Sequence, residues 1–260
     1  MEALTTNWGV MNLERSQGTG PALVFVNSLG TDLRMWDDVI ARLPHEWATL
    51  RMDKRGHGLS SSAPEGYTIP DLADDVIAAM DHAGMDRAII VGCSIGGLIA
   101  QHIALIAPTR VVSLVLSNTS CVLGTPEAWQ DRIAAIRANG MADMADQILP
   151  RWFGPDFLAR PEAALWRTML AHCDVDGYTA TCRAIAGTDI TNRMQHITHP
   201  ALVIGGAHDL ATPPDVVRAL ADILPVSDLI IFETTGHLPA VEAPEAFAAA
   251  LTGFVERTQS

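Results

Sequence analysis

Lysine is almost missing from this sequence, which contains a single one, Lys54, among 260 residues. Acidic residues outnumber basic ones, and the formal net charge is −13. The longest basic cluster is the short segment DKRGH at residues 53–57. Nucleic-acid binding needs clustered lysine and arginine side chains that neutralise phosphates, so this composition argues against a nucleic-acid-binding protein.

Cysteine is scarce as well, and the few cysteines lie far apart with no C-x-x-C pair: Cys93, Cys121, Cys173 and Cys182. The N-terminal segment MEALTTNWGVMNLERS has acidic and polar residues early and lacks the apolar region that a signal peptide needs. In a chain that is not exported, such cysteines are expected to be reduced thiols. We therefore expect a cytoplasmic protein.

Charge is absent from residues 88–107, AIIVGCSIGGLIAQHIALIA. This run is long enough to span a bilayer, and Gly92 and Gly96 have the G-x-x-x-G spacing of packed membrane helices. The alternative is a strand that turns sharply into a helix. Hydrophobic residues make up 48% of the chain and charged residues 18%, which is typical of a globular protein. The length suits one domain, with or without an inserted subdomain.

Apolar runs alternate with helical patterns over most of the chain. Runs typical of buried strands lie at residues 22–27, 48–53, 87–93, 111–118, 201–206 and 228–232. This alternation predicts an α/β fold with a mostly parallel central sheet flanked by helices. A membrane span would remove the central strand and place Gln101 and His102 in lipid, which favours the strand-turn-helix interpretation of residues 88–107.

Residues 121–190 break the alternation, because they contain no convincing strand. Helical stretches are separated there by the turn-forming pairs NG, GP and DG at residues 139–140, 154–155 and 176–177. We interpret this segment as a helical cap inserted into an α/β core of residues 1–120 and 191–260. Its tryptophans Trp129 and Trp152 fit two interpretations equally, core packing and lining of a site beneath the cap.

A nucleophile motif, G-x-S-x-G, covers residues 92–96 and places Ser94 between the predicted central strand and the helix after it. A serine hydroxyl needs a base, and the base needs a carboxylate that fixes its tautomer. Asp209 and His237 follow two later strands, so they are expected at the same edge of the sheet. The backbone N–H groups of Leu29 and Ile95 are the candidates for an oxyanion hole, the donor pair that stabilises the negative oxygen of a tetrahedral intermediate.

Other reactive side chains have less specific patterns. We interpret Cys93 as small core filler, and His208 as a structural or rim residue. The segment DKRGHGLS at residues 53–60 is expected to brace a loop rather than react. His196 and His199 have metal-like spacing, but no third ligand stands nearby, so no metal site is predicted.

With these residues assembled, the chain resembles the α/β-hydrolase superfamily from end to end. More narrowly, it resembles the 3-oxoadipate enol-lactonases of the β-ketoadipate pathway for aromatic compound degradation. The shared segments are NSLGTDLRMW, RMDKRGHGLS, GCSIGG, TPEAWQDR, RWF and GGAHDLATPP. Two features depart from that pattern: Cys93 replaces the usual leucine before the serine, and TTGHLPAVEAPEAF follows a generic hydrolase pattern.

The resemblance implies a cofactor-free esterase that opens 3-oxoadipate enol-lactone through Ser94, Asp209 and His237. This small-molecule substrate carries a carboxylate, and Arg132, one turn beyond Trp129, is our first candidate to bind it. A solvated helix arginine is the alternative for Arg132. Three alternatives for the whole chain are another small-molecule carboxylesterase, a C–C bond hydrolase of meta-cleavage type, and a ligand receptor that barely turns over.

Overall fold

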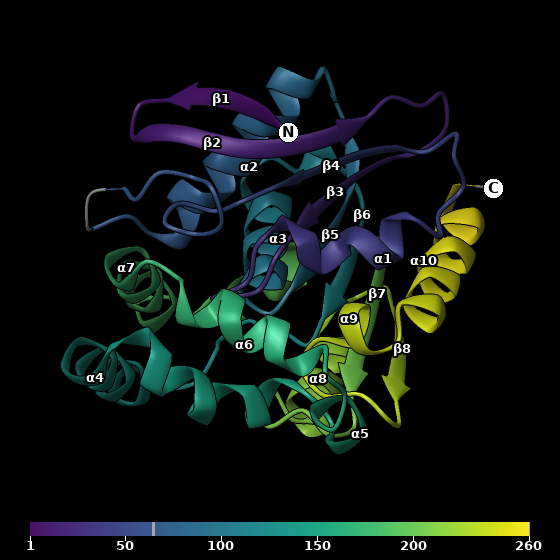
Figure 1. Cartoon of the computed structure of the whole chain (residues 1–260). Coiled ribbons are helices and arrows are strands. Elements are labelled where there is room, and N and C mark those ends of the chain that lie inside the picture. The colour runs from purple at the N-terminus through teal and green to yellow at the C-terminus, as the bar shows by residue number, and fades with distance from the viewer. Residues whose placement is uncertain (64–65, 260) are drawn as a thin grey trace.

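An eight-stranded sheet forms the centre of the computed structural model, which describes residues 1–63 and 66–259 (Figure 1). The strand order is β1-β2-β4-β3-β5-β6-β7-β8. The first two strands pair antiparallel, and the strands from β3 onward are parallel to one another. The bounds are β1 (Glu2–Thr6), β2 (Gly9–Ser16), β3 (Ala22–Val26), β4 (Ala48–Met52), β5 (Ala88–Cys93), β6 (Val111–Ser117), β7 (Ala201–Gly206) and β8 (Ser227–Phe232).

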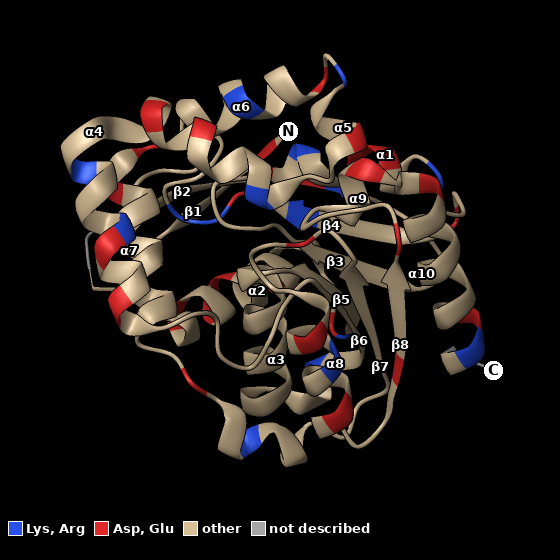
Figure 2. Cartoon of the chain, turned by 90° about the horizontal axis from the view of Figure 1, so that it is seen from below, with Lys and Arg blue, Asp and Glu red and all other residues tan. Residues whose placement is uncertain are grey.

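Helices cover both faces of the sheet, so the central strands are apolar on both sides. On one face lie α1 (Asp37–Ile40) and α10 (Pro244–Gln259), and on the other lie α2 (Ile69–Ala83), α3 (Ile95–Ile106) and α8 (Pro214–Ile223) (Figure 2). Every residue of β5 and β7 is buried. The predicted α/β fold with a mostly parallel, helix-flanked sheet is confirmed. Short helices complete this part: η1 (Leu33–Trp36), η2 (Pro108–Arg110), η3 (Thr191–His196) and α9 (Pro239–Glu242).

The uncharged run at residues 88–107 forms strand β5, a sharp turn at Ser94, and helix α3. All of β5 and residues 95–104 of α3 are buried within the α/β core, where β5 lies between β3 and β6. This placement confirms the strand-turn-helix interpretation. Within the described ranges, no helix combines the length and the apolar character needed to cross a membrane.

Four α-helices precede η3 between β6 and β7 along the chain: α4 (Pro126–Trp152), α5 (Pro155–Leu158), α6 (Ala163–Ala171) and α7 (Val175–Ala186) (Figure 1). Helix α4 is interrupted at Gly140, where φ is 80°, as the NG pair predicts. The predicted turn at the DG pair is wrong, because Asp176 and Gly177 lie inside α7. Gly177 packs so closely on the backbone of Gly56 that a side chain would overlap it, a contact that only the fold reveals.

Candidate active site

Ser94 occupies the turn between β5 and α3 in a backbone conformation that is rare for a side-chain-bearing residue, with φ 57° and ψ −120°. The two motif glycines allow this turn. A Cβ at Gly92 would overlap the carbonyl oxygen of Gly96, and a Cβ at Gly96 would overlap that of Val26 on β3. The turn therefore presents the Ser94 hydroxyl at the carboxyl end of the sheet, where it lines a pocket.

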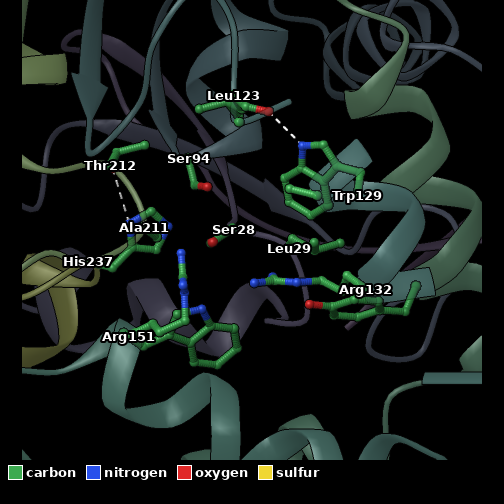
Figure 3. A pocket seen from close by; sticks show the side chains of 14 residues that line it. Ser28, Leu29, Ser94, Leu123, Trp129, Arg132, Arg151, Ala211, Thr212 and His237 are labelled. Atoms are coloured by element: carbon green, nitrogen blue, oxygen red, sulfur yellow. Dashed lines mark hydrogen bonds between the residues drawn. The ribbon is translucent and has the colours of Figure 1, made fainter. Parts of the chain in front are cut away.

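His237 and Asp209 meet beside Ser94, although each comes from a loop after a different strand. The two are buried, and His237 Nδ1 lies 2.7 Å from Asp209 Oδ2. Because an ionised carboxylate only accepts hydrogen bonds, Nδ1 carries the hydrogen and Nε2 is left as an acceptor. Ser94 and His237 line the same pocket, and the Ser94 hydroxyl makes no hydrogen bond to another described residue (Figure 3). The structure thus brings the three predicted residues together.

Asp209 is held as a carboxylate by five donors. Its Oδ1 accepts from the N–H groups of Ala211 and Thr212, and its Oδ2 accepts from His237, the Thr212 hydroxyl (2.6 Å) and Asn118 Nδ2 (2.8 Å). Burial acts to raise the pKa of Asp209, but the charge of His237 and these hydrogen bonds outweigh it and hold the pKa below its usual value. A negative charge therefore stays behind the imidazole ring at neutral pH.

Two further side chains fix the loop that carries His237. Asn118, at the end of β6 with φ 50°, also donates from Nδ2 to the carbonyl oxygen of Gly236 (3.1 Å). The carboxylate of Glu242 accepts from the N–H groups of Gly236 (2.7 Å) and Gly154 (2.8 Å). Burial raises the pKa of Glu242 to about 7. Gly236, the residue before His237, is therefore held by hydrogen bonds at both its carbonyl oxygen and its N–H group.

Leu29 and Ile95 are the two predicted oxyanion donors. Leu29 lines the pocket, and its N–H has no backbone acceptor in the described part of the chain. Ile95 is buried and is the first residue of α3, where helix N–H groups have no intrahelical acceptor. Ile95 is not among the residues that line the pocket, so its part in the oxyanion hole stays a prediction.

The pocket is a cavity of about 120 Å³ between the sheet edge and helices α4 and α7. Trp129, Arg132 and Trp152 of α4 all line it, so the lining interpretation holds for both tryptophans and Arg132 faces the cavity. The indole N–H of Trp129 donates to the carbonyl oxygen of Leu123 (2.6 Å), and the Arg132 guanidinium lies 5.1 Å from the Trp129 ring centre. The backbone carbonyl of Trp152 accepts from the N–H of His237 (2.6 Å). Helix α4 is thus connected directly to the imidazole loop.

A second arginine, Arg151, enters the same pocket from the other half of α4 (Figure 3). Its Nη2 donates to the carbonyl oxygen of Leu210 (3.0 Å). Burial and then the charge of Arg132 lower the pKa of Arg151. Neither guanidinium forms a salt bridge with a carboxylate of the described residues. The cavity therefore holds two positive charges close to Ser94 that have no acidic partner among the residues the structure describes.

The remaining predicted residues lie outside this pocket. Cys93 is buried, its Sγ donates to the carbonyl oxygen of His237 (3.5 Å), and burial raises the pKa of its thiol. The backbone N–H of His208 donates to the carbonyl oxygen of Thr235. Asp53 accepts from the N–H groups of Leu33 and Leu59, as expected of a loop brace.

All four cysteines are free thiols, as predicted. His199 Nε2 lies 3.0 Å from the carbonyl oxygen of Pro108, so it has a structural partner. Across residues 1–63 and 66–259, no group of three or more His, Cys, Asp and Glu side chains is arranged to hold a metal ion.

Sequence reasoning missed four residues of the site: Arg151, Asn118, Thr212 and Glu242. Arg151 directly precedes Trp152 in the segment RWF. Its position next to a candidate lining residue could have indicated that Arg151 also faces the pocket. Asn118 and Thr212 lie beyond the carboxyl ends of β6 and β7, the location that identified Asp209. Glu242 has no such signal, because its role depends on the fold that brings the N–H group of the distant Gly154 to its carboxylate.

The comparisons with known proteins agree with this geometry. The sequence profile of the alpha/beta hydrolase family matches residues 23–250. The chain is 35% identical over 243 residues to 3-oxoadipate enol-lactonase 2 of Acinetobacter baylyi, covering 93% of this chain and 91% of that protein. The crystal structure of the enol-lactonase from Burkholderia xenovorans LB400 superimposes with a TM-score of 0.94 at 35% identity, covering 98% and 100% of the two chains. A thermophilic esterase from Thermogutta terrifontis, with malate bound, gives a TM-score of 0.91 at 27% identity, covering 100% and 99%. The chain belongs to the alpha/beta hydrolase family and is a hydrolytic enzyme.

Proposed function

We propose that this protein hydrolyses 3-oxoadipate enol-lactone to 3-oxoadipate with Ser94 as nucleophile, His237 as general base and Asp209 as the carboxylate that orients it. The observation that carries the proposal is the shared pocket. A serine hydroxyl on a strained turn and an imidazole backed by a buried carboxylate face the same cavity as two arginines that form no salt bridge with a carboxylate of the described residues. Similarity to proteins named as enol-lactonases supports the same substrate.

The first half of the reaction is acyl transfer to Ser94. His237 Nε2 takes the hydroxyl proton as Oγ attacks the lactone carbonyl, and the carbonyl oxygen becomes an oxyanion held by the N–H groups of Leu29 and Ile95. The ring C–O bond then breaks. The leaving oxygen departs as an enolate, which needs less acid assistance than an alkoxide. The enolate takes up at carbon the proton that His237 releases, which gives the ketone and leaves His237 neutral again.

The second half releases the product. Once the enolate has become a ketone, it is a poor nucleophile, so the ring does not readily close again. His237 then removes a proton from a water molecule that attacks the acyl-enzyme, and a second tetrahedral oxyanion forms in the same site. Collapse of this intermediate returns the proton to Ser94 Oγ and frees the new carboxylate.

The substrate's own carboxylate is proposed to bind Arg132 and Arg151. Two guanidinium groups without acidic partners repel each other, and an anion between them relieves that repulsion. The small cavity supports a compact substrate, since sites for drug-sized ligands enclose about 300–1,000 Å³. Trp129 and Trp152 supply apolar walls for the lactone ring. We further propose that the enzyme acts in the β-ketoadipate pathway in the cytoplasm, which fits its free thiols.

The direct test is turnover by the purified protein. Loss of the enol-lactone is followed by ultraviolet absorbance beside a panel of neutral esters and lactones of similar size. We expect kcat/KM for the enol-lactone to exceed that for the neutral compounds by about 100-fold, the effect of a charge-assisted hydrogen-bond pair. Equal or better turnover of neutral esters would favour a general carboxylesterase. A single slow turnover with tightly held product would favour a ligand receptor.

A further inference from the structure

The chain's only lysine lies behind the oxyanion hole. Lys54 is buried, and its Nζ donates to the carbonyl oxygens of Asn27 (3.0 Å) and Ser28 (2.9 Å). Nζ makes no salt bridge with a carboxylate of the described residues, although burying a lysine is unfavourable without such a partner. Asp53, its neighbour in sequence, directs its carboxylate to the N–H groups of Leu33 and Leu59 instead.

The carbonyl of Ser28, one of the two that Lys54 binds, belongs to the same peptide unit as the N–H of Leu29. That oxygen also accepts from the N–H (3.3 Å) and the hydroxyl (2.9 Å) of Thr31, while the N–H of Ser28 is directed to Met35 Sδ (3.4 Å). Hydrogen bonds in a chain polarise one another, and a positive charge on the carbonyl side makes the amide hydrogen a stronger donor. The Leu29 N–H is therefore polarised, and it has no backbone acceptor within residues 1–63 and 66–259.

We propose that Lys54 is a positioning residue for the oxyanion hole, whose charge acts through the Ser28–Leu29 peptide to stabilise the tetrahedral oxyanion. This inference rests on the proposed function, because it requires an oxyanion formed at Ser94. The lysine touches neither substrate nor reacting atoms. Its effect is electrostatic and adds to the fixed orientation of the loop.

The surroundings of Lys54 suit such a role, because they leave its charge sensitive to a nearby anion. Burial lowers the pKa of Lys54 to about 7, against the opposing effect of Asp53, Cys173, Cys93 and Asp32. His57 does not compete for the proton, because burial and then the charge of Lys54 lower its pKa to about 3. An oxyanion beyond the peptide must raise the pKa of Lys54 by the same factor by which charged Lys54 stabilises the oxyanion, since the coupling is reciprocal.

The test uses the single lysine as a spectroscopic reporter. Protein labelled with ¹³C-lysine gives one side-chain Cε signal, which is titrated by NMR in the free enzyme and in the adduct with a small trifluoromethyl ketone. Such a ketone adds to a serine hydroxyl, so its carbonyl oxygen becomes an alkoxide in the oxyanion hole and the proton passes to the imidazole. At about 7 Å and an effective dielectric constant of about 20, we expect the Lys54 pKa to rise by about 1 to 2 pH units.

Two variants separate charge from geometry. Lys54→Met keeps the length of the side chain without its charge, and Lys54→Gln keeps a neutral donor. Both are expected to lower kcat and the affinity for the ketone by about 10- to 50-fold, with KM little changed. Thr31→Val is the matched control, because it removes a neutral donor from the same carbonyl, and it should have a clearly smaller effect.

Each outcome decides a different point. An adduct that forms without moving the Lys54 titration overturns this proposal and leaves the proposed function standing. A ketone that forms no adduct with Ser94 overturns the proposed function and this proposal with it. If the lysine variants fold poorly, the titration of the unaltered protein still gives the answer.

Discussion

Arg132 and Arg151 offer a test of substrate charge in which enzyme and substrate are altered in parallel. Replacing either arginine by methionine removes a positive charge from the pocket while keeping an apolar side chain of similar reach. Neither guanidinium has an acidic partner in the described part of the chain, so no buried carboxylate is left unpaired by the change. The loss should therefore appear in substrate recognition rather than in stability.

The magnitude follows from the contact proposed. A hydrogen bond to a charged group contributes about 1.5–3 kcal/mol, and a unit charge pair at about 4 Å contributes about 4 kcal/mol at an effective dielectric constant of about 20. Arg151 lies beside the like charge of Arg132, and this repulsion offsets part of the gain. We expect each single replacement to lower kcat/KM for the enol-lactone by about 2–3 kcal/mol, or roughly 30- to 150-fold.

The assay compares the acidic enol-lactone with a neutral lactone of the same ring size for the unaltered enzyme, both single variants and the double variant. The neutral compound should lose less than about 3-fold in kcat/KM, because it makes no charge contact. Arg167→Met is the matched control, since Arg167 on α6 pairs with Asp146 outside the pocket. Equal losses for the acidic and neutral lactones would refute carboxylate binding by this pair.

Three further predictions concern the scaffold of the site. Gly96→Ala should lower the free energy of unfolding by more than about 3 kcal/mol in urea denaturation, because its Cβ would overlap the Val26 carbonyl oxygen, and an unchanged midpoint would contradict this. Asp209→Asn should lower kcat by about 10³- to 10⁴-fold through the wrong His237 tautomer, and activity within 10-fold of the original would count against the pair. Burial raises the pKa of Glu242 to about 7, so its contribution to stability is complete below about pH 4.5 and is lost as the pH rises through 7. The stability of the unaltered protein relative to Glu242→Gln should therefore fall by about 2–3 kcal/mol over that range, and a difference independent of pH would contradict the shift.

The parallel part of the fold was predictable because doubly buried strands are apolar on both faces, as β5 and β7 are. The N-terminal hairpin of β1 and β2 was not predicted. These strands lie at the antiparallel edge of the sheet, and several of their side chains are exposed, so their sequences EALTT and GVMNLERS form no apolar run. A search based on apolar runs cannot find strands that are half exposed.

The active site also has a part that was predictable from the sequence and a part that was not. Ser94, Asp209 and His237 were predictable because parallel strands end at one edge, which brings the loops after them together. The supporting contacts were not. Glu242 holds Gly236 and Gly154 through tertiary hydrogen bonds, and Lys54 reaches the carbonyl of Ser28 across the loop. Such contacts depend on side-chain directions in the assembled fold, which residue type and spacing do not encode.

The most direct measurement is the single-turnover and steady-state hydrolysis of 3-oxoadipate enol-lactone by the unaltered enzyme and by Ser94→Ala. Covalent attack by Ser94 predicts a loss of several orders of magnitude in kcat, with folding and product binding retained. It also predicts an acyl adduct on Ser94 in rapidly quenched samples analysed by mass spectrometry. A Ser94→Ala enzyme that keeps a tenth of the original activity would contradict the account.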